Sequence, residues 1–410
     1  MGSSSPRPRL VPKLSALLAL GLACLFLAGC KMSGPQSTIV VDGPVARSQL
    51  NLFYVTLAVT TFIFVTVGGA LAYAQFRFRE KKGEAAGDPP AQTHGHPMVE
   101  IGLIVVSTLL LVIIAVPTVK GIAYMEDTPD RENALVVKVT GYQWWFKFEY
   151  PELGIVTANE MVIPTNRPIH LELRTVDVIH SFWVPKLAGK KDLMPNRANH
   201  MWLQADKADY YWAQCAEFCG ESHANMKFRV VSLEPAAFAE WEQRQRGEAR
   251  TIEAATAAAT AEQPRFAPFE QPRVQRALYS PVSDDGIAGA ESPFAYWQEM
   301  QVTPAPGTED AALVAQGRRL FLEKTCLGCH SIRGHNAMGI SGPDLTHFGS
   351  RTTIASAMMD NTADNLRVWL QHPNDVKPGN LMWRDGYVPN KITISDEEAA
   401  ALVAYLHSLK

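Results

Sequence analysis

The chain has 410 residues, which is long enough for two or three domains. Its formal net charge of −3 is close to neutral, so the composition excludes a general attraction to nucleic acid. The six cysteines form three close pairs, at positions 24 and 30, 215 and 219, and 326 and 329. Such short spacings argue against a disulfide framework, which joins distant segments, and favour metal or cofactor chemistry.

The first apolar run has the features of a signal sequence. Basic residues precede it, and residues 14–29 are apolar but short for a bilayer span. The run ends in "LAGC", which resembles the lipobox at which bacteria cleave a precursor and lipidate the cysteine. We therefore expect residues 1–29 to be a lipoprotein-type signal peptide and Cys30 to carry lipid. The alternative is an ordinary signal peptide with an incidental cysteine.

Two longer apolar runs, residues 50–74 and 101–119, predict a transmembrane hairpin over residues 45–125. The basic segment "RFREKK" follows the first run and marks the cytoplasmic side. Both C-terminal regions are therefore expected outside the membrane, on the same face as Cys30. Glu100, at the start of the second run, is either a helix-start residue that favours the N-terminal dipole or a point of proton uptake.

Residues 133–235 are predicted to form an all-β domain. The stretches 134–150 and 160–177 are rich in β-branched and aromatic residues, show no helical period, and contain turn signals at short intervals. A small antiparallel sandwich or barrel is the fold class that fits this pattern.

The segment "CAEFCGESHANM", residues 215–226, carries the chemistry of this domain. Thiolates, an imidazole and a thioether form a soft ligand set that suits copper. A single blue-type copper needs only one cysteine, whereas two cysteines on one loop can bridge two copper ions. The second ion requires another histidine, and His180 in "DVIHSFWVP" is the candidate. A zinc site made of His180, Cys215, Cys219 and His223 would leave the methionine unexplained, and so would a buried cysteine pair.

This segment matches the C-x-E-x-C-G-x-x-H-x-x-M signature of cytochrome c oxidase subunit 2. "GYQWWFKFEYP", "VIHSFWVP" and the two apolar runs extend the resemblance over residues 45–235. The resemblance implies a cupredoxin-like sandwich that holds a binuclear copper A centre. Its implied ligands are His180, Cys215, Cys219, His223, Met226 and the backbone carbonyl of Glu217. It also implies that the Glu217 carboxylate helps to bind magnesium at the interface with subunit 1.

The resemblance gives roles to two further residues. Trp144 falls where the family has the tryptophan through which electrons arrive, in an aromatic cluster over the copper. Glu100 falls where the family has the acid at the mouth of a proton channel. The chain departs from the family at two points: "GLIVVST" replaces the usual W-T-x-x-P stretch, and Phe146 stands where a second tryptophan is common. The changed stretch leaves open which surface that helix presents to lipid or to other subunits. Phe146 leaves open whether the aromatic relay continues beyond Trp144.

Residues 236–305 form a connector between the two regions outside the membrane. Its stretch "TIEAATAAATAEQP" has low complexity and predicts a weak helix or disorder. The segments "PAAFAEWEQRQ" and "SPFAYWQEMQ" share an F-A-x-W pattern, through chance or through a local duplication. A connector of this length is expected to let the last domain move.

Residues 308–410 contain "CLGCH", a C-x-x-C-H motif that is the signature of covalently attached c-type haem. Cys326 and Cys329 would form thioethers with the haem vinyl groups, and His330 would be an axial ligand. Redox dithiols and half zinc sites share the pentapeptide, but a single pair in an exported domain fits neither. A helical stretch before the motif and a terminal helix capped by Ser395 predict an all-α cytochrome c domain.

The sixth iron ligand should be a methionine, and four residues compete for this role. Met338 lies close to the attachment loop, and Met358 and Met359 occupy a helix-like stretch where core packing is expected. Met382, in "KPGNLMW", resembles the family's ligand loop before the last helix and is our choice. A tryptophan follows it where the family usually has proline.

These features predict a multidomain membrane protein with two transmembrane helices, a copper A sandwich and a cytochrome c domain. We expect an electron-transfer subunit of a haem-copper cytochrome c oxidase in the bacterial inner membrane, with both cofactor domains on the periplasmic or outer face. Its expected partners are subunits 1 and 3, a cytochrome c donor and membrane lipid, but no nucleic acid. Oxygen reduction and proton pumping would belong to subunit 1.

Four other functions share some of these features. A copper-delivery or metal-binding protein without enzymatic partners would not co-purify with a large haem-bearing membrane subunit. A copper- and haem-binding carrier that serves a different terminal reductase would share both motifs. A nitrous-oxide-type reductase would need a large propeller domain, and two membrane helices argue against it. A quinol oxidase subunit 2 lacks the copper site.

Overall fold

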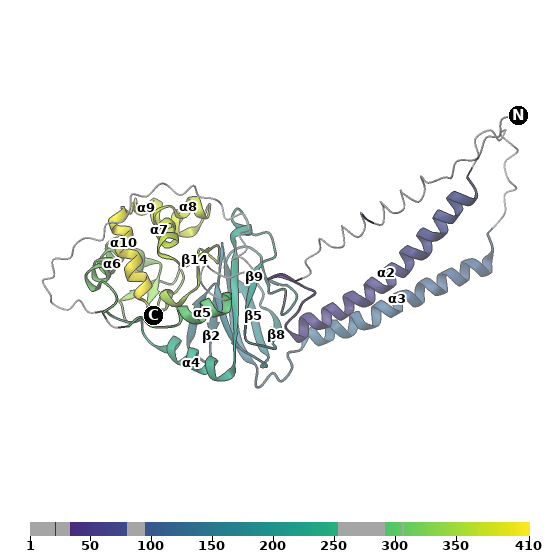
Figure 1. The fold of residues 1–410 in the computed structure, drawn as a ribbon, viewed down its shortest axis with the longest axis horizontal. Coiled ribbons are helices and arrows are strands. Elements are labelled where there is room, and N and C mark those ends of the chain that lie inside the picture. Colours follow the sequence, from purple (N-terminus) through teal and green to yellow (C-terminus); the bar gives the residue numbers. More distant parts are fainter. Residues whose placement is uncertain (1–20, 22–32, 80–94, 253–291, 306) are drawn as a thin grey trace, which may run out of the picture.

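A computed structural model describes residues 21, 33–79, 95–252, 292–305 and 307–410. Two long helices extend from a globular part in which a β-sandwich and a helical domain lie side by side (Figure 1). Cys30 and almost all of the expected signal peptide lie outside the described residues, as does nearly all of the low-complexity stretch of the connector. The described elements confirm the predicted fold class.

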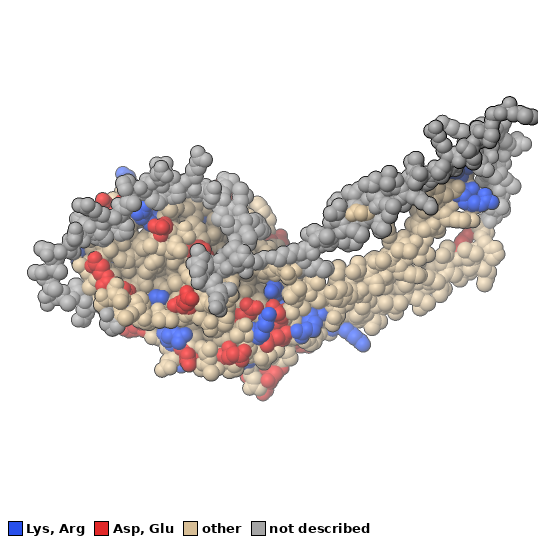
Figure 2. All heavy atoms as spheres, in the orientation of Figure 1, with Lys and Arg blue, Asp and Glu red and all other residues tan. Residues whose placement is uncertain are grey.

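The two apolar runs form helices α2 (Pro44–Arg77) and α3 (Pro97–Glu126). Both are long enough to cross a membrane, with mean hydropathies of 2.0 and 2.8 over their most apolar windows, which are not buried in the protein. Figure 2 shows an uncharged surface along most of this hairpin, whereas charged side chains gather on the globular part. Each helix has a proline in its first turn, where the missing N–H costs no hydrogen bond.

The β-sandwich consists of two five-stranded sheets in the described part of the chain, with strand orders β3-β2-β1-β5-β8 and β4-β10-β9-β6-β7. The strands are β1 (Leu135–Tyr142), β2 (Trp145–Tyr150), β3 (Ile155–Ala158), β4 (Glu160–Pro164), β5 (Ile169–Thr175), β6 (His180–Trp183), β7 (Lys191–Leu193), β8 (Asn199–Leu203), β9 (Asp209–Cys215) and β10 (Lys227–Leu233). The expected antiparallel arrangement is incomplete, since β1 pairs with β5, and β10 with β4, in parallel. Between the two strands of each parallel pair the chain visits the opposite sheet, which makes the parallel return possible.

An aromatic cluster fills the sandwich at the end that carries the candidate copper residues. Phe146, Phe148 and Phe182 surround Phe228, with ring centroids 4.8, 5.7 and 4.8 Å from it. All four rings are fully buried. Because a close-packed interior resists displacement, this cluster fixes the ends of β6 and β9, from which the site is built.

The two F-A-x-W segments form helices α4 (Pro235–Arg246) and α5 (Pro293–Met300). Each places its tryptophan, Trp241 or Trp297, in the apolar core of the sandwich. Both tryptophans are 2% exposed. The ends of the connector are therefore part of the folded structure.

The C-terminal domain is built from short helices and tight turns. The helical segments are α6 (Ala311–Glu323), η2 (Cys326–Gly328), η3 (Phe348–Ser350), α7 (Ala363–Gln371), α8 (Pro373–Val376), η4 (Met382–Tyr387), α9 (Val388–Asn390) and α10 (Asp396–Ser408). Two pairs of two-residue strands accompany them, β11 (Ser331–Ile332) with β12 (Ala337–Met338) and β13 (Thr353–Ile354) with β14 (Met359–Asp360). Helix α6 crosses α10 at Gly317, where a side chain would overlap the Ala401 carbonyl, so only glycine permits this approach. The predicted capping box is present, because Ser395 Oγ accepts from Glu398 N and the Glu398 carboxylate accepts from Ser395 N.

The helix-like interpretation of the stretch before α7 is wrong. Residues 355–357 have φ angles of 53, 62 and 56°, a left-handed conformation, and Met359 lies in a short strand. The helix begins only at Ala363, after the cap residue Thr362. Alanine and methionine favour helices, but contacts with the sandwich override this preference here.

Candidate copper and haem sites

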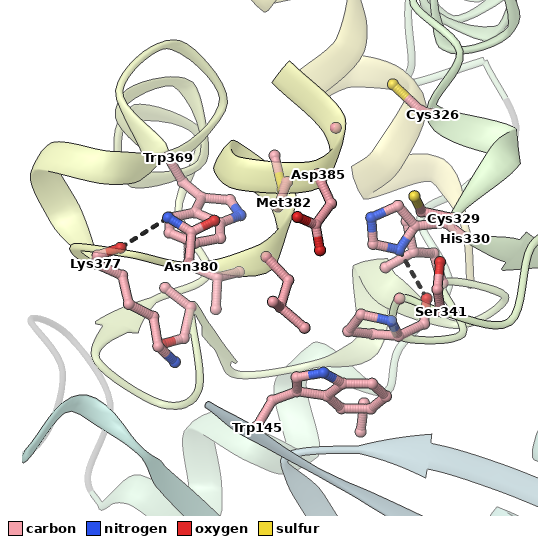
Figure 3. A pocket seen from close by; sticks show the side chains of 18 of the residues that line it. Trp145, Cys326, Cys329, His330, Ser341, Trp369, Lys377, Asn380, Met382 and Asp385 are labelled. Carbon is pink, nitrogen blue, oxygen red and sulfur yellow. Dashed lines mark hydrogen bonds between the residues drawn. The ribbon is translucent and has the colours of Figure 1, made fainter. Parts of the chain in front are cut away.

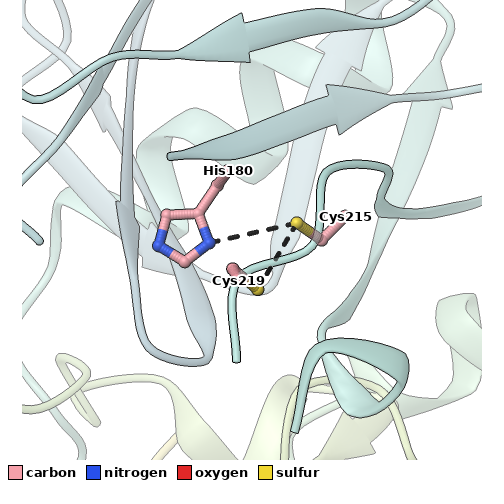
Figure 4. A group of neighbouring side chains, drawn as sticks. All are labelled: His180, Cys215 and Cys219. Carbon is pink, nitrogen blue, oxygen red and sulfur yellow. Dashed lines mark hydrogen bonds between the residues drawn. The ribbon is translucent and has the colours of Figure 1, made fainter. Parts of the chain in front are cut away.

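Three ligand-type side chains converge at one end of the sandwich (Figure 4). Cys215 ends β9, Cys219 lies in the loop that follows, and His180 begins β6. Their ligand atoms all lie within 4.8 Å of one another, and all three residues are buried. Cys215 Sγ is 3.9 Å from His180 Nδ1 and 3.9 Å from Cys219 Sγ.

The remaining residues of the signature loop complete this cluster. Cys219 Sγ lies 3.4 Å from His223 Nδ1 and 3.8 Å from Met226 Sδ. The Glu217 carbonyl oxygen lies 3.4 Å from Cys215 Sγ. The Cys215 N–H donates to the Met226 carbonyl, with a distance of 2.9 Å, and so closes the loop on itself. The structure therefore brings together all the residues that the sequence proposed for copper.

The orientation of His180 is fixed by Asp177, a residue that the sequence analysis missed. Asp177 Oδ1 lies 2.8 Å from His180 Nε2, which directs Nδ1 toward Cys215. Burial opposes charge on the ring, but the hydrogen bonds and charges of Asp177 and Cys215 together outweigh it and raise the pKa of His180. A carboxylate behind a ligating histidine selects the tautomer and the ring orientation. The three-residue spacing in "DVIH" was the available signal.

The donor set fits copper in chemistry as well as in position. The hydrogen bond from Cys219 lowers the pKa of Cys215 to about 4, so one thiolate forms readily. The same bond, together with burial, raises the pKa of Cys219, so its proton leaves only when a cation is bound. Two thiolates, two imidazoles and a thioether form a set of soft and borderline ligands that suits copper.

A cavity of about 440 Å³ forms the second candidate site (Figure 3). Cys326, Cys329 and His330 all contribute to its lining. His330 Nδ1 donates to the Pro343 carbonyl at 2.8 Å, so Nε2 remains free to coordinate a metal. Burial lowers the pKa of His330 and keeps the ring neutral, as an iron ligand must be. The cavity has the size of a cofactor pocket.

Met382 also lines this cavity. It is the only one of the four candidate methionines, all of which the structure describes, to do so. Met338 is 86% exposed. Met382 lies in the π-helical turn η4 and not in the open loop that the sequence suggested. The turn is held where Asn380 Oδ1 accepts from Trp383 N at 2.9 Å, and π turns frequently occur at functional sites.

Trp144 lies between the two sites. Its Nε1 donates to the Cys219 carbonyl at 3.0 Å, and Gln143 Nε2 donates to the same oxygen at 2.8 Å. Trp144 and Trp145 both line the haem-sized cavity, and Figure 3 shows Trp145 there. The Trp144 carbonyl accepts from Lys377 Nζ of the C-terminal domain at 2.5 Å. One residue thus contacts the copper loop, the cavity and the C-terminal domain.

The other carboxylates proposed from the sequence lie at the surface. Glu100 is exposed in the first turn of α3, at the end of the hairpin remote from the sandwich (Figure 1). The side chain of Glu217 is 43% exposed and lies 3.5 Å from Lys190 Nζ. Phe146, where the family has a second tryptophan, is fully buried, with its ring centroid 6.4 Å from that of His180.

Three protein families match parts of this chain. The family "Cytochrome C oxidase subunit II, transmembrane domain" matches residues 40–120, "Cytochrome C oxidase subunit II, periplasmic domain" matches residues 154–233, and "Cytochrome c" matches residues 314–410. The cytochrome c oxidase subunit 2 of Alkalihalophilus pseudofirmus is 32% identical over 97% of both chains. That of Bacillus subtilis is 30% identical over 96% of this chain and 97% of the relative. The quinol oxidase subunit 2 of Bacillus subtilis is 31% identical over only 57% of this chain and 73% of the relative.

Proposed function

Because the chain belongs to the cytochrome c oxidase subunit 2 family and has a cytochrome c domain at its C-terminus, we propose that it is the electron-transfer subunit of a haem-copper oxidase. It is a membrane protein with a periplasmic domain, and its families imply copper A and haem c as cofactors. In this proposal a cytochrome donates electrons to the C-terminal domain, and the sandwich delivers them to subunit 1, which reduces oxygen and pumps protons.

The position of Trp144 is the main support for this proposal, because this residue contacts both candidate sites. Its indole donates to the copper loop at the Cys219 carbonyl, and the residue also lines the cavity beside the C-x-x-C-H motif. Electron transfer requires the two centres to be close and rigidly placed, and buried contacts of this kind provide both. The same contacts have no evident purpose in a protein that only stores metal.

The chain's own residues would hold copper A. The donors would be the thiolates of Cys215 and Cys219, the imidazoles of His180 and His223, and the weaker ligands Met226 and the Glu217 carbonyl. When bound, copper A takes up and releases one electron. Gln143 and Trp144 hold the loop through the Cys219 carbonyl, so these donors are positioned by hydrogen bonds that do not involve the metal.

The second cofactor would be held by Cys326 and Cys329 through thioethers, and by His330 and Met382 as axial ligands. When bound, haem c also carries one electron, and a methionine ligand raises its reduction potential. His330 is oriented by its hydrogen bond to Pro343, and burial keeps it neutral. These residues come from two separate segments, so the cavity forms only in the folded domain.

We also assign roles at the contacts with other subunits. The exposed Glu217 carboxylate would share a magnesium ion with subunit 1, because a hard oxygen donor suits magnesium better than copper. Glu100, exposed on α3, would take up protons, and subunits 1 and 3 would pack against the hairpin. Cys30 would carry lipid. The topology places the hairpin in the bacterial inner membrane with "RFREKK" on the cytoplasmic side.

The test is to purify the complex through a tag on this chain. The proposal expects a large haem-bearing subunit in the complex, a c-type haem spectrum from this chain, and a paramagnetic resonance signal of one electron shared by two coppers. A signal from a single isolated copper would contradict the bridged centre. Purification with a different terminal reductase would support the alternative of a carrier for that enzyme.

A further inference from the structure

Both described ends of the connector place a helix on the sandwich. Beyond α4, Ala249 also packs in the core of the C-terminal domain, where its N–H donates to the Arg333 carbonyl at 3.0 Å. Trp241 of α4 packs against Tyr150, with ring centroids 5.6 Å apart. Trp297 of α5 enters the same core, and its Nε1 donates to Glu160 Oε1 at 2.7 Å. Residues 253–291, which lie outside the described structure, therefore connect two helices that are anchored on one domain. The C-terminal domain follows α5 after only a short segment, residues 301–310.

Glu160 joins α5 and the C-terminal domain to the sandwich. It begins β4 and is 8% exposed. Its Oε1 accepts from Trp297, while its Oε2 accepts from the N–H and the hydroxyl of Thr352 at 3.3 and 3.0 Å. Burial raises the pKa of this carboxyl, while the hydrogen bonds from Trp297 and Thr352 and the nearby charge of Arg351 act in the opposite direction. A buried carboxylate is tolerated only when its oxygens are satisfied, and here the donors come from two other segments of the chain.

A strained turn of the C-terminal domain contacts the sandwich beside Glu160. Residues 355–357 are left-handed, a conformation that costs about 1 to 2 kcal/mol per residue and persists only where surrounding contacts enforce it. Ser356 Oγ donates to the Trp144 carbonyl at 2.7 Å, and the Ser356 carbonyl accepts from Lys227 N at 3.3 Å. Arg229 Nη2 donates to the next carbonyl, that of residue 357, at 3.2 Å. These contacts with the sandwich hold the turn in this shape.

We propose that Glu160 is a positioning residue whose contacts with Trp297 and Thr352 latch the cytochrome c domain onto the sandwich. The surface that it covers, here called the Trp144 face, includes Trp144 and Arg229, both of which bond to the C-terminal domain. Residues 253–291 then do not set the distance between the two domains, contrary to the sequence expectation of a domain that moves on a long connector. This inference rests on the proposed function, since it explains how electrons reach the sandwich from a fixed position. It has a consequence for partners: the Trp144 face is covered, so an external cytochrome must donate to the C-terminal domain.

Cutting the connector tests the latch directly. A protease recognition sequence flanked by glycines is inserted after residue 270 of the full chain, and membranes that contain the complex are digested until denaturing gels show no uncut chain. The cut leaves α4 and the sandwich with the membrane helices, and leaves α5 with the haem domain. The latch holds the cut haem domain on the membranes, so the haem absorbance should remain in the pellet after sedimentation. Release of haem into the supernatant from the otherwise unchanged chain would overturn the proposal.

Matched variants separate the latch from general stability. Trp297→Ala and Glu160→Ala should each increase the rate of haem release after cutting by about tenfold or more, because each leaves a buried polar group without its partner. Trp202→Ala removes a buried tryptophan of β8 that packs against Tyr124 of α3, on the membrane side of the cut, and should leave the release rate unchanged. Thr352→Val, which removes one donor with little change in volume, should have a smaller effect in the same direction as Trp297→Ala.

Two controls keep this inference distinct from the proposed function. The copper resonance and the haem spectrum are recorded before cutting, and the absence of either would contradict the proposed function rather than the latch. With both present, equal release rates in Trp297→Ala, Glu160→Ala and the unchanged chain would show that other contacts hold the domain and would overturn the role of Glu160.

Discussion

Lys377 Nζ lies 2.5 Å from the carbonyl oxygen of Trp144, although the two residues are 233 positions apart in the chain. Lys377 is 3% exposed and also donates to Ser356 Oγ at 2.7 Å. Burial lowers its pKa to about 7. A lysine of the cytochrome c domain thus binds the tryptophan that contacts the copper loop, and it fixes the two domains at the point where electrons would cross.

Lys377→Met should loosen this contact without disturbing either domain. The substitution keeps an apolar stem of similar length but leaves the Trp144 carbonyl with Ser356 as its remaining donor across the interface. Hydrogen–deuterium exchange should become faster in peptides that contain residues 143–144 and 355–357. Lys324→Met is the matched control, since Lys324 Nζ donates to Thr393 within the cytochrome c domain. Unchanged exchange at both peptides would remove Lys377 from the interface.

Asp177→Asn should weaken copper binding. The change keeps the size of the side chain but removes the charge that holds His180 Nε2. Substitutions of this kind typically reduce metal affinity by about 10- to 100-fold. Competition with a copper chelator measures the change in the purified chain. Asp209→Asn, at the half-buried start of β9, is the control and should bind copper normally. Equal affinities in both variants would mean that Asp177 does not orient the ligand.

Acidification should destabilise the cytochrome c domain through His407. This residue is packed in α10, with Nε2 3.1 Å from Asn361 Oδ1, and burial lowers its pKa to about 4. Between pH 6.5 and pH 4 the unfolded chain binds a proton that the folded chain does not, so stability falls as the pH decreases through this window. At pH 4.5, His407 should lower the free energy of unfolding by about 2 kcal/mol relative to pH 7.

The variant His407→Gln keeps a donor for Asn361 but cannot titrate. Urea unfolding, followed by the haem absorbance at pH 7 and pH 4.5, should show a smaller loss of stability in the variant than in the unchanged chain. Other buried histidines also titrate, so the difference between the two proteins is the quantity to compare. An equal loss in both would mean that His407 is not the titrating group.

Met382→Ala should remove the axial thioether of the haem. The weak sulfur-to-iron charge-transfer band should disappear and the reduction potential should fall, because a methionine ligand raises it. Met358→Ala is the control, since Met358 does not line the cavity, and both properties should be retained. An absorption spectrum and a redox titration of each purified variant measure the band and the reduction potential. Loss of the band in Met358→Ala alone would reverse the assignment.

The sequence identified the candidate sites because their chemistry restricts both residue type and spacing. A loop with two cysteines, a histidine and a methionine has few other uses, and C-x-x-C-H is equally restrictive. Glu160, Asp177 and Lys377 were missed because each is an ordinary residue whose role comes from its partners. The partners of Glu160 and Lys377 are 137 and 233 positions away, and no local pattern reports such a contact.

The left-handed turn was unpredictable for a related physical reason. The sequence "ASA" at residues 355–357 contains no glycine or asparagine to indicate positive φ angles, and its conformation comes from contacts with another domain. The repeated F-A-x-W pattern was visible in the connector. Only the fold shows that Trp241 and Trp297 share one core and that the connector is anchored at both ends.

Time-resolved reduction of the full chain, loaded with both cofactors, tests the central claim most directly. A pulse of a soluble one-electron reductant is applied, and the haem and copper absorbances are followed together. The account expects haem to be reduced first and then reoxidised as copper is reduced, at a rate that depends on neither protein concentration nor solvent viscosity. Reduction of copper before haem, or a transfer rate that increases with protein concentration, would contradict it.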